Sequence, residues 1–135
     1  MIFRKRKIDR QDATTDDRRN IGAVGEALAI RALKEKGYRI LALNHRSKLG
    51  EIDIIAKEGK TLAFVEVKTR RTDGFGGPKT AVTPGKQRNI SKVALDYLKQ
   101  TGQINEKARF DVVAIRLLPG HPEIEIIKNA FDLAY

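Results

Sequence analysis

Residues 50–70 read GEIDIIAKEGKTLAFVEVKTR, and this stretch decides the fold. Two apolar runs, 51–57 and 61–68, flank a glycine-containing connection, which predicts two strands and a tight turn. Charged side chains interrupt these runs at Asp53, Glu66 and Lys68. Charged groups seldom occupy core-like segments unless they are paired or functional, so these three side chains are site candidates. The hairpin alone does not distinguish a site from an exposed polar face, on which a Glu-x-Lys pattern is common.

The turn sets which residues face each other across the two strands. A two-residue turn at 58–59 places Asp53 opposite Phe64 and Glu51 opposite Glu66. Asp53 is then diagonal to Glu66, with Cα atoms about 7–8 Å apart. Two carboxylates at this diagonal can share a metal ion that prefers oxygen ligands. A register slip of a residue or two leaves this pairing open.

The rest of the chain predicts a mixed sheet with helices packed on it. Apolar residues at helical spacing predict helices over 16–36, capped by Thr14 or Thr15, and over 84–100, capped by Thr83; strands are expected at 38–44, 51–57, 61–68, 109–117 and 123–129. The first three strands form an antiparallel meander, and the second helix crosses over to a parallel fourth strand. Residues 1–15 are charged and aperiodic, which predicts a flexible basic arm before a single domain over 16–135.

The composition points to a polyanionic partner. The chain of 135 residues carries 27 basic and 17 acidic side chains, and 68–92 concentrates much of the excess. Nucleic acid is the commonest partner of such a charge, although a solubilising surface or an acidic protein partner are alternatives. The sequence contains no cysteine, no bilayer-length apolar run and no signal-peptide pattern. A cytoplasmic protein without membrane contact is therefore expected.

Several short motifs together carry a family resemblance. They are IGAVGEALA (21–29), GEIDIIA (50–56), FVEVKTR (64–70), FGGP (75–78) with AV (81–82), and RFDVVAI (109–115). In combination they resemble the PD-(D/E)xK nuclease superfamily, and most closely its YraN-like family, which is related to archaeal Holliday-junction resolvases. The resemblance implies an α/β fold with a restriction-endonuclease-like mixed sheet flanked by helices, in the order α-β-β-β-α-β-β. One departure is Ile52, which stands where proline often precedes the aspartate.

The resemblance also implies roles for individual residues. Asp53, Glu66 and the Val67 carbonyl would hold Mg²⁺ or Mn²⁺, and Glu26 would reach over from the first helix as an extra or outer ligand. Lys68 would orient the attacking water or neutralise developing charge. The expected catalytic set is Asp53, Glu66, Lys68 and Glu26.

Basic residues around this set are expected to contact phosphates, which position nucleic acid without reading its sequence. They are Arg70, Arg71 and Lys79 in the loop 69–83, and Lys86, Arg88 and Lys92 on the second helix. The helical pattern turns Lys86 inward towards the strand ends. It turns Arg88 and Lys92 outward, where ordinary solubilising charge is an equal alternative.

The expected function is a metal-dependent endonuclease for structured or branched DNA. The resemblance to resolvases implies a homodimer, because two strands must be cut. A DNA-binding module that keeps the fold without catalysis is the first alternative, and a protein-interaction module is the second. The sequence leaves DNA against RNA open. Asp111 resembles a family position, but its place within a strand favours a structural role.

Overall fold

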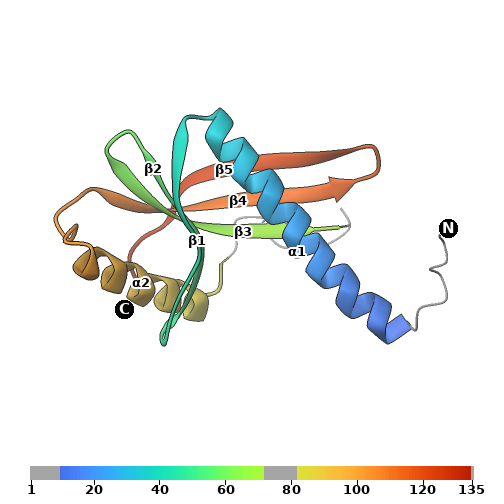
Figure 1. Cartoon of the computed structure of the whole chain (residues 1–135), viewed down its shortest axis with the longest axis horizontal. Helices are drawn as coiled ribbons and strands as arrows, with labels where there is room; N and C mark the ends of the chain where they lie inside the picture. Colours follow the sequence, from blue (N-terminus) through green and yellow to red (C-terminus); the bar gives the residue numbers. More distant parts are fainter. Residues whose placement is uncertain (1–9, 72–81, 135) are drawn as a thin grey trace.

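The structure, a computed structural model, describes residues 10–71 and 82–134, with side chains from Asn20 onward. Two helices and five strands follow one another in the predicted order (Figure 1): α1 (Arg10–Glu35), β1 (Tyr38–Ser47), β2 (Gly50–Glu58), β3 (Thr61–Arg70), α2 (Pro84–Gln100), β4 (Ala108–Leu118) and β5 (His121–Phe131). Among these described residues, no helix has the length and apolarity needed to cross a bilayer.

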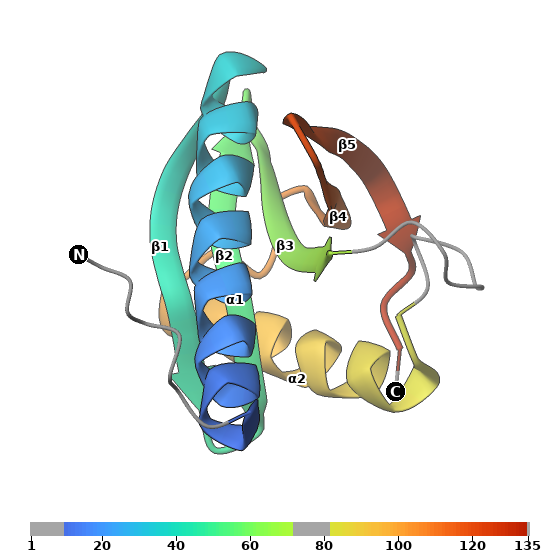
Figure 2. The ribbon, with the colours of Figure 1, turned by 90° about the vertical axis from the view of Figure 1, so that its right-hand side faces the viewer.

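The strands form one mixed sheet in the order β1-β2-β3-β4-β5. All neighbours pair antiparallel except β3 and β4, which run parallel because α2 crosses over between them. Two separate apolar clusters cover the sheet, one including Ala29 and Leu33 of α1 and the other including Ile90 and Val93 of α2. The helices therefore cover opposite faces, and Figure 2 shows α1 along β1 and β2 with α2 lying across the molecule behind them. The predicted fold class is confirmed.

The first helix is longer than the sequence pattern predicted. It begins at Arg10, so residues 10–15 of the expected arm are helical, and Thr14 and Thr15 lie inside the helix instead of capping it. Apolar periodicity marks only the part of a helix with an apolar face, and in this sequence it begins at Ile21. No glycine or proline interrupts 10–20, so the sequence contains no signal that would end the helix there.

The hairpin turn lies one residue later than predicted. Glu58 pairs with Thr61, so the turn consists of Gly59 and Lys60. Gly59 has a φ of +60°, a conformation that glycine adopts without strain and that suits the first turn position. The expected pairing of Asp53 with Phe64 is therefore wrong.

This one-residue move shifts the strand register by two. Ile55 now faces Phe64, and the last regular pair is Ile54 with Val65. Asp53 and Glu66 are the next residues along each strand, so the two carboxylates are cross-strand neighbours instead of a diagonal pair.

Asp111 lies at the centre of a buried polar network. Its fully buried carboxylate accepts hydrogen bonds from the Tyr38 hydroxyl (3.0 Å), Arg109 Nε (2.9 Å) and the Asn129 backbone N–H (2.9 Å). Arg109 also pairs with Glu58. The network joins β1, β2, β4 and β5, so Asp111 has the structural role that its strand position favoured.

The approach of α1 to the sheet depends on a glycine. A Cβ built on Gly25 would lie 1.9 Å from Thr69 Oγ1 and 2.9 Å from Thr69 Cβ. Only hydrogen fits at this distance, so Gly25 lets the helix cross β3 beside the end of the strand that carries Glu66 and Lys68. Glu26 follows Gly25 directly and is thereby held close to the sheet.

Two glycines of α1 provide a matched test of this contact. Gly25→Ala should lower the free energy of unfolding by about 1–3 kcal/mol, because overpacking outweighs the gain in helix propensity. Gly22→Ala should raise it by about 0.5–1 kcal/mol, because nothing lies within 4 Å of its built Cβ. Urea unfolding of both variants measures the difference. Equal stabilisation by the two substitutions would refute a tight crossing at Gly25.

Candidate active site

The site forms where β2 and β3 stop pairing regularly. Ile52 and Ile55 lie in the same apolar cluster, although residues three apart in a regular strand point to opposite faces. The alternation therefore breaks between them, at Asp53. Asp53 Oδ2 accepts the Val67 backbone N–H at 2.8 Å, so a side chain takes over from the backbone ladder at this point. This hydrogen bond fixes the Asp53 carboxylate against β3.

Glu66 is a buried carboxylate on the neighbouring strand. Glu66 is 6% exposed, and the residues before it on β3, Phe64 and Val65, are buried apolar residues. Lys86 from the first turn of α2 places its Nζ 2.6 Å from Glu66 Oε2. Buried charges are stable only when paired, and Lys86 supplies that partner.

The two carboxyl groups strongly affect each other. The pKa of Asp53 is raised to about 7. Burial is the largest cause, and the charge of Glu66 and a hydrogen bond with its carboxyl group add to it, while the Val67 N–H and the charge of Lys86 act in the opposite direction. A carboxyl group that resists ionisation beside a second carboxyl group is typical of sites that hold a cation or move a proton.

Two lysines lie near the carboxyl pair, and their pKa values are shifted in opposite directions. Burial lowers the pKa of Lys68, and the nearby charges of Arg70 and Lys86 lower it further, although Glu66 opposes them. Burial alone would lower the pKa of Lys86, but its hydrogen bond with Glu66 and the charges of Glu66, Asp53 and Glu51 outweigh this, so its pKa is raised. Lys86 therefore stays firmly charged, while Lys68 is the more readily deprotonated of the two.

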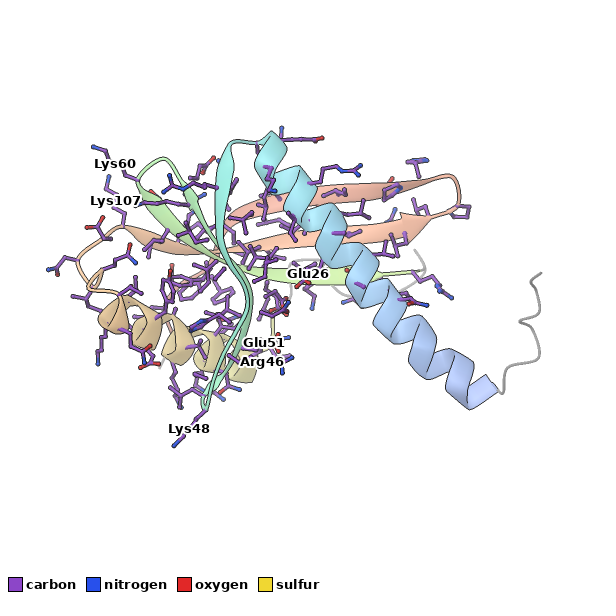
Figure 3. All side chains as sticks on the ribbon, viewed as in Figure 1. Glu26, Arg46, Lys48, Glu51, Lys60 and Lys107 are labelled. Atoms are coloured by element: carbon purple, nitrogen blue, oxygen red, sulfur yellow. The ribbon has the colours of Figure 1, made fainter. Side chains whose placement is uncertain are left out.

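Glu26 belongs to a neighbouring polar group centred on Asn44. With its amide nitrogen turned towards the carboxylates, Asn44 donates to Glu26 Oε2 (3.1 Å) and to Glu51 Oε2 (3.0 Å). Arg46 pairs with Glu51 at 3.5 Å. Figure 3 shows Glu26 on α1 and Glu51 with Arg46 on the β1–β2 hairpin, while Lys48 extends outward at the hairpin tip. Asn44 thus joins α1 to the hairpin next to Asp53.

A cavity of about 600 Å³ lies beside α1, and its lining includes Glu26, Asn44, Asp53, Val67, Thr69 and Arg71 but not Glu66, Lys68 or Lys86. Glu26 and Asp53 come from distant parts of the sequence but face the same space. Two of the basic residues predicted to contact phosphates, Arg88 and Lys92, are exposed on α2 and do not line this cavity. Lys79 lies outside the described residues.

The carboxyl groups at this site fit a divalent cation that keeps several water ligands. Within the described part of the chain, no three aspartate, glutamate or histidine side chains converge as a ready-made metal site. Mg²⁺, however, commonly uses one or two carboxylates and keeps several waters. Two adjacent, largely buried carboxylates with a raised pKa fit that requirement, because a dication would relieve their repulsion.

Asn44 was not among the predicted site residues. It has a φ of +51°, in the left-handed region that asparagine tolerates better than most residues. An asparagine directly after the apolar run 40–43 was the available signal, since strands disfavour it. The sequence predicted that Lys86 points inward towards the strand ends, but it did not predict the contact with Glu66.

Asp53→Asn should show the cost of the buried charge without any activity assay. The folded-state pKa of about 7 lies above the ordinary 3.8, so the folded protein keeps a proton that the unfolded chain loses as pH rises between these values. Wild type should therefore lose stability over this window, and the variant should not. The stability advantage of Asp53→Asn should grow by roughly 1–3 kcal/mol between about pH 5 and about pH 8 in EDTA.

Denaturant unfolding at the two pH values measures this change, with exposed Asp132→Asn as the control. The control should show the same pH dependence as wild type. An advantage of Asp53→Asn that stays constant or shrinks at high pH would show that Asp53 ionises normally.

Comparison of the sequence with known proteins shows the family to which the chain belongs. Residues 25–115 match the model of "Uncharacterised protein family UPF0102". A UPF0102 protein of Geotalea daltonii is 57% identical over 122 residues, covering 89% of this chain and 95% of that protein. Others are 56% identical in Geobacter sulfurreducens (85% and 91% covered) and 50% identical in Rhodococcus jostii (82% and 95% covered). The chain therefore belongs to the UPF0102 family, the YraN-like group of the PD-(D/E)xK superfamily.

Proposed function

We propose that the protein is a metal-dependent endonuclease that hydrolyses phosphodiester bonds in structured or branched DNA. One observation carries the proposal: the carboxyl groups of Asp53 and Glu66 are neighbours at the point where the regular pairing of β2 and β3 ends, and burial together with the charge of Glu66 raises the pKa of Asp53 to about 7. A core that only needed stability would favour apolar side chains here, because two buried carboxyl groups repel each other.

Asp53 and Glu66, with the Val67 carbonyl, are the proposed ligands of Mg²⁺ or Mn²⁺. When bound, such an ion polarises the scissile phosphate and lowers the pKa of a water molecule. Asp53 is suited to this role because the Val67 N–H already fixes its orientation. Glu26 lines the same cavity, and its hydrogen bond from Asn44 makes it an outer group that orients water.

Lys68 is the proposed group that handles the attacking water. It follows Glu66 by two residues, so regular alternation puts both on one face of β3. Burial and the charges of Arg70 and Lys86 lower the pKa of Lys68, so this lysine loses its proton more readily than an ordinary lysine does. A lysine in this state can accept a hydrogen bond from water and then carry the proton.

The basic surface is the proposed phosphate contact. Arg71 lines the cavity that contains Asp53, and Arg70 lies at the end of β3. Arg88 and Lys92 are exposed on α2, the helix that supplies Lys86. Lys79 belongs to the same proposal through its sequence position. Such contacts hold DNA by its backbone, which suits a protein that selects DNA shape.

We further propose that the protein acts in the cytoplasm, where a DNA substrate is available, and as a homodimer. Cutting both strands of a branched molecule needs two sites, and residues 10–71 and 82–134 supply the one buried carboxylate pair of Asp53 and Glu66.

Cleavage assays with labelled four-way junctions, flaps, duplex and single strands test the proposal. Wild type should cut branched substrates with Mg²⁺ or Mn²⁺ and not with EDTA. Asp53→Asn and Glu66→Gln should each lower the rate at least about 100-fold, because each removes a charged metal ligand. The exposed Glu106→Gln should cut at the wild-type rate. Cleavage that persists in EDTA, or in both site variants, would contradict the assignment.

A DNA-binding module without catalysis is the second candidate, and the Lys86–Glu66 contact favours it. A lysine that already neutralises Glu66 lets the carboxyl pair persist without a metal. This candidate predicts binding whose logarithmic affinity falls linearly with the logarithm of salt concentration, and no cutting with any metal. Failure to bind DNA at about 0.1 M salt would instead favour an acidic protein partner.

A further inference from the structure

Lys86 contacts the carboxylate pair from a rigid position. It lies in the first turn of α2, where the Thr83 side chain accepts the Lys86 backbone N–H at 3.2 Å and Pro84 begins the helix. The start of the helix is therefore fixed, and only the lysine side chain is free to move. Its Nζ lies 2.6 Å from Glu66 Oε2.

The two partners differ sharply in exposure. The Glu66 side chain is 7% exposed, while the Lys86 side chain is 53% exposed. Glu66 thus has little freedom to leave the contact, whereas about half of the Lys86 side-chain surface is in contact with solvent. Any event that separates the pair must move the lysine.

The ammonium lies beside a pair of carboxyl groups. Its partner Glu66 is the cross-strand neighbour of Asp53, and the Val67 N–H holds the Asp53 carboxylate against β3 at 2.8 Å. Lys86 therefore places a positive charge next to the two carboxyl groups that are the proposed metal ligands.

We propose that Lys86 is a built-in counter-ion that competes with the divalent metal for Glu66, and that its side chain leaves the carboxylate when the metal binds. This inference rests on the proposed function, because it needs a metal at Asp53 and Glu66. An ammonium and a dication repel each other at such short range in a low-dielectric site, so Glu66 serves one of them at a time. Lys86 thereby keeps the pair assembled before the metal arrives and lowers the metal affinity.

Metal affinity measured by calorimetry tests the competition directly. Lys86→Met keeps the apolar stem and removes the charge. With Mn²⁺ alone at about pH 8 and about 0.15 M salt, it should bind at least about fivefold more tightly than wild type. Lys99→Met, which removes an exposed charge at the far end of α2, should bind Mn²⁺ as wild type does.

Thermal unfolding of the same proteins separates competition from a merely structural contact. In EDTA, Lys86→Met should melt several degrees below wild type, because the carboxyl pair has lost its counter-ion. Saturating Mn²⁺ should raise its melting temperature more than it raises that of wild type. A purely structural lysine would lower both melting temperatures equally and leave the Mn²⁺ affinity unchanged.

Chemical reactivity of the wild-type lysine provides a test that needs no variant. An acetylating reagent must reach the amine nitrogen, and the contact with Glu66 at 2.6 Å holds the Lys86 Nζ against the carboxylate. Mg²⁺ should therefore increase the acetylation of Lys86 several-fold, measured by mass spectrometry, without changing that of Lys99. Unchanged or slower acetylation of Lys86 at saturating Mg²⁺ would overturn the inference.

The outcomes also separate this inference from the proposed function. If wild type binds Mn²⁺ and Lys86→Met binds it equally or more weakly, the competition is refuted while the metal site stands. If neither protein binds Mn²⁺, the metal site itself is refuted, and the counter-ion role falls with it.

Discussion

The structure depends on one unfavourable contact, the placement of two carboxyl groups next to each other in a largely buried setting. Burial and mutual repulsion both act against ionisation, and the pKa of Asp53 rises to about 7 as a result. Two apolar clusters, one under each helix, hold the strands rigidly enough to keep the groups together. A pair held in this way has much to gain from a cation, so the same contact that weakens the fold favours metal binding.

Three local features bring the necessary elements to this point. The absence of a side chain at Gly25 lets α1 cross β3 at Thr69, and this places Glu26 beside the cavity that Asp53 lines. The break in alternation between Ile52 and Ile55 turns the Asp53 carboxylate towards the Val67 N–H. The capped start of α2 projects Lys86 onto Glu66. These features come from α1, the β2–β3 hairpin and α2, so the site exists only in the folded chain.

The sequence predicted the elements well, because apolar periodicity and the cap residue Thr83 report local structure that needs no tertiary information. It failed where a single backbone choice decides long-range geometry. Placing the turn one residue early moved Asp53 from beside Glu66 to a diagonal position, since register changes by two for each step of the turn. It also missed Asn44, whose hydrogen bonds to Glu26 and Glu51 join residues that are far apart in sequence. The polar start of α1 was missed because its sequence has no apolar periodicity.

The most direct test of the central claim is a crystal structure of the wild-type protein grown with Mn²⁺, with anomalous scattering recorded to locate the ion. The account predicts an anomalous peak within about 2.0–2.2 Å of a carboxylate oxygen of both Asp53 and Glu66, with Lys86 no longer in contact with Glu66. A structure at saturating Mn²⁺ with no peak at this position, and with the Lys86–Glu66 contact intact, would contradict it. The carboxyl pair would then be a neutralised structural feature of a DNA-binding or protein-binding fold.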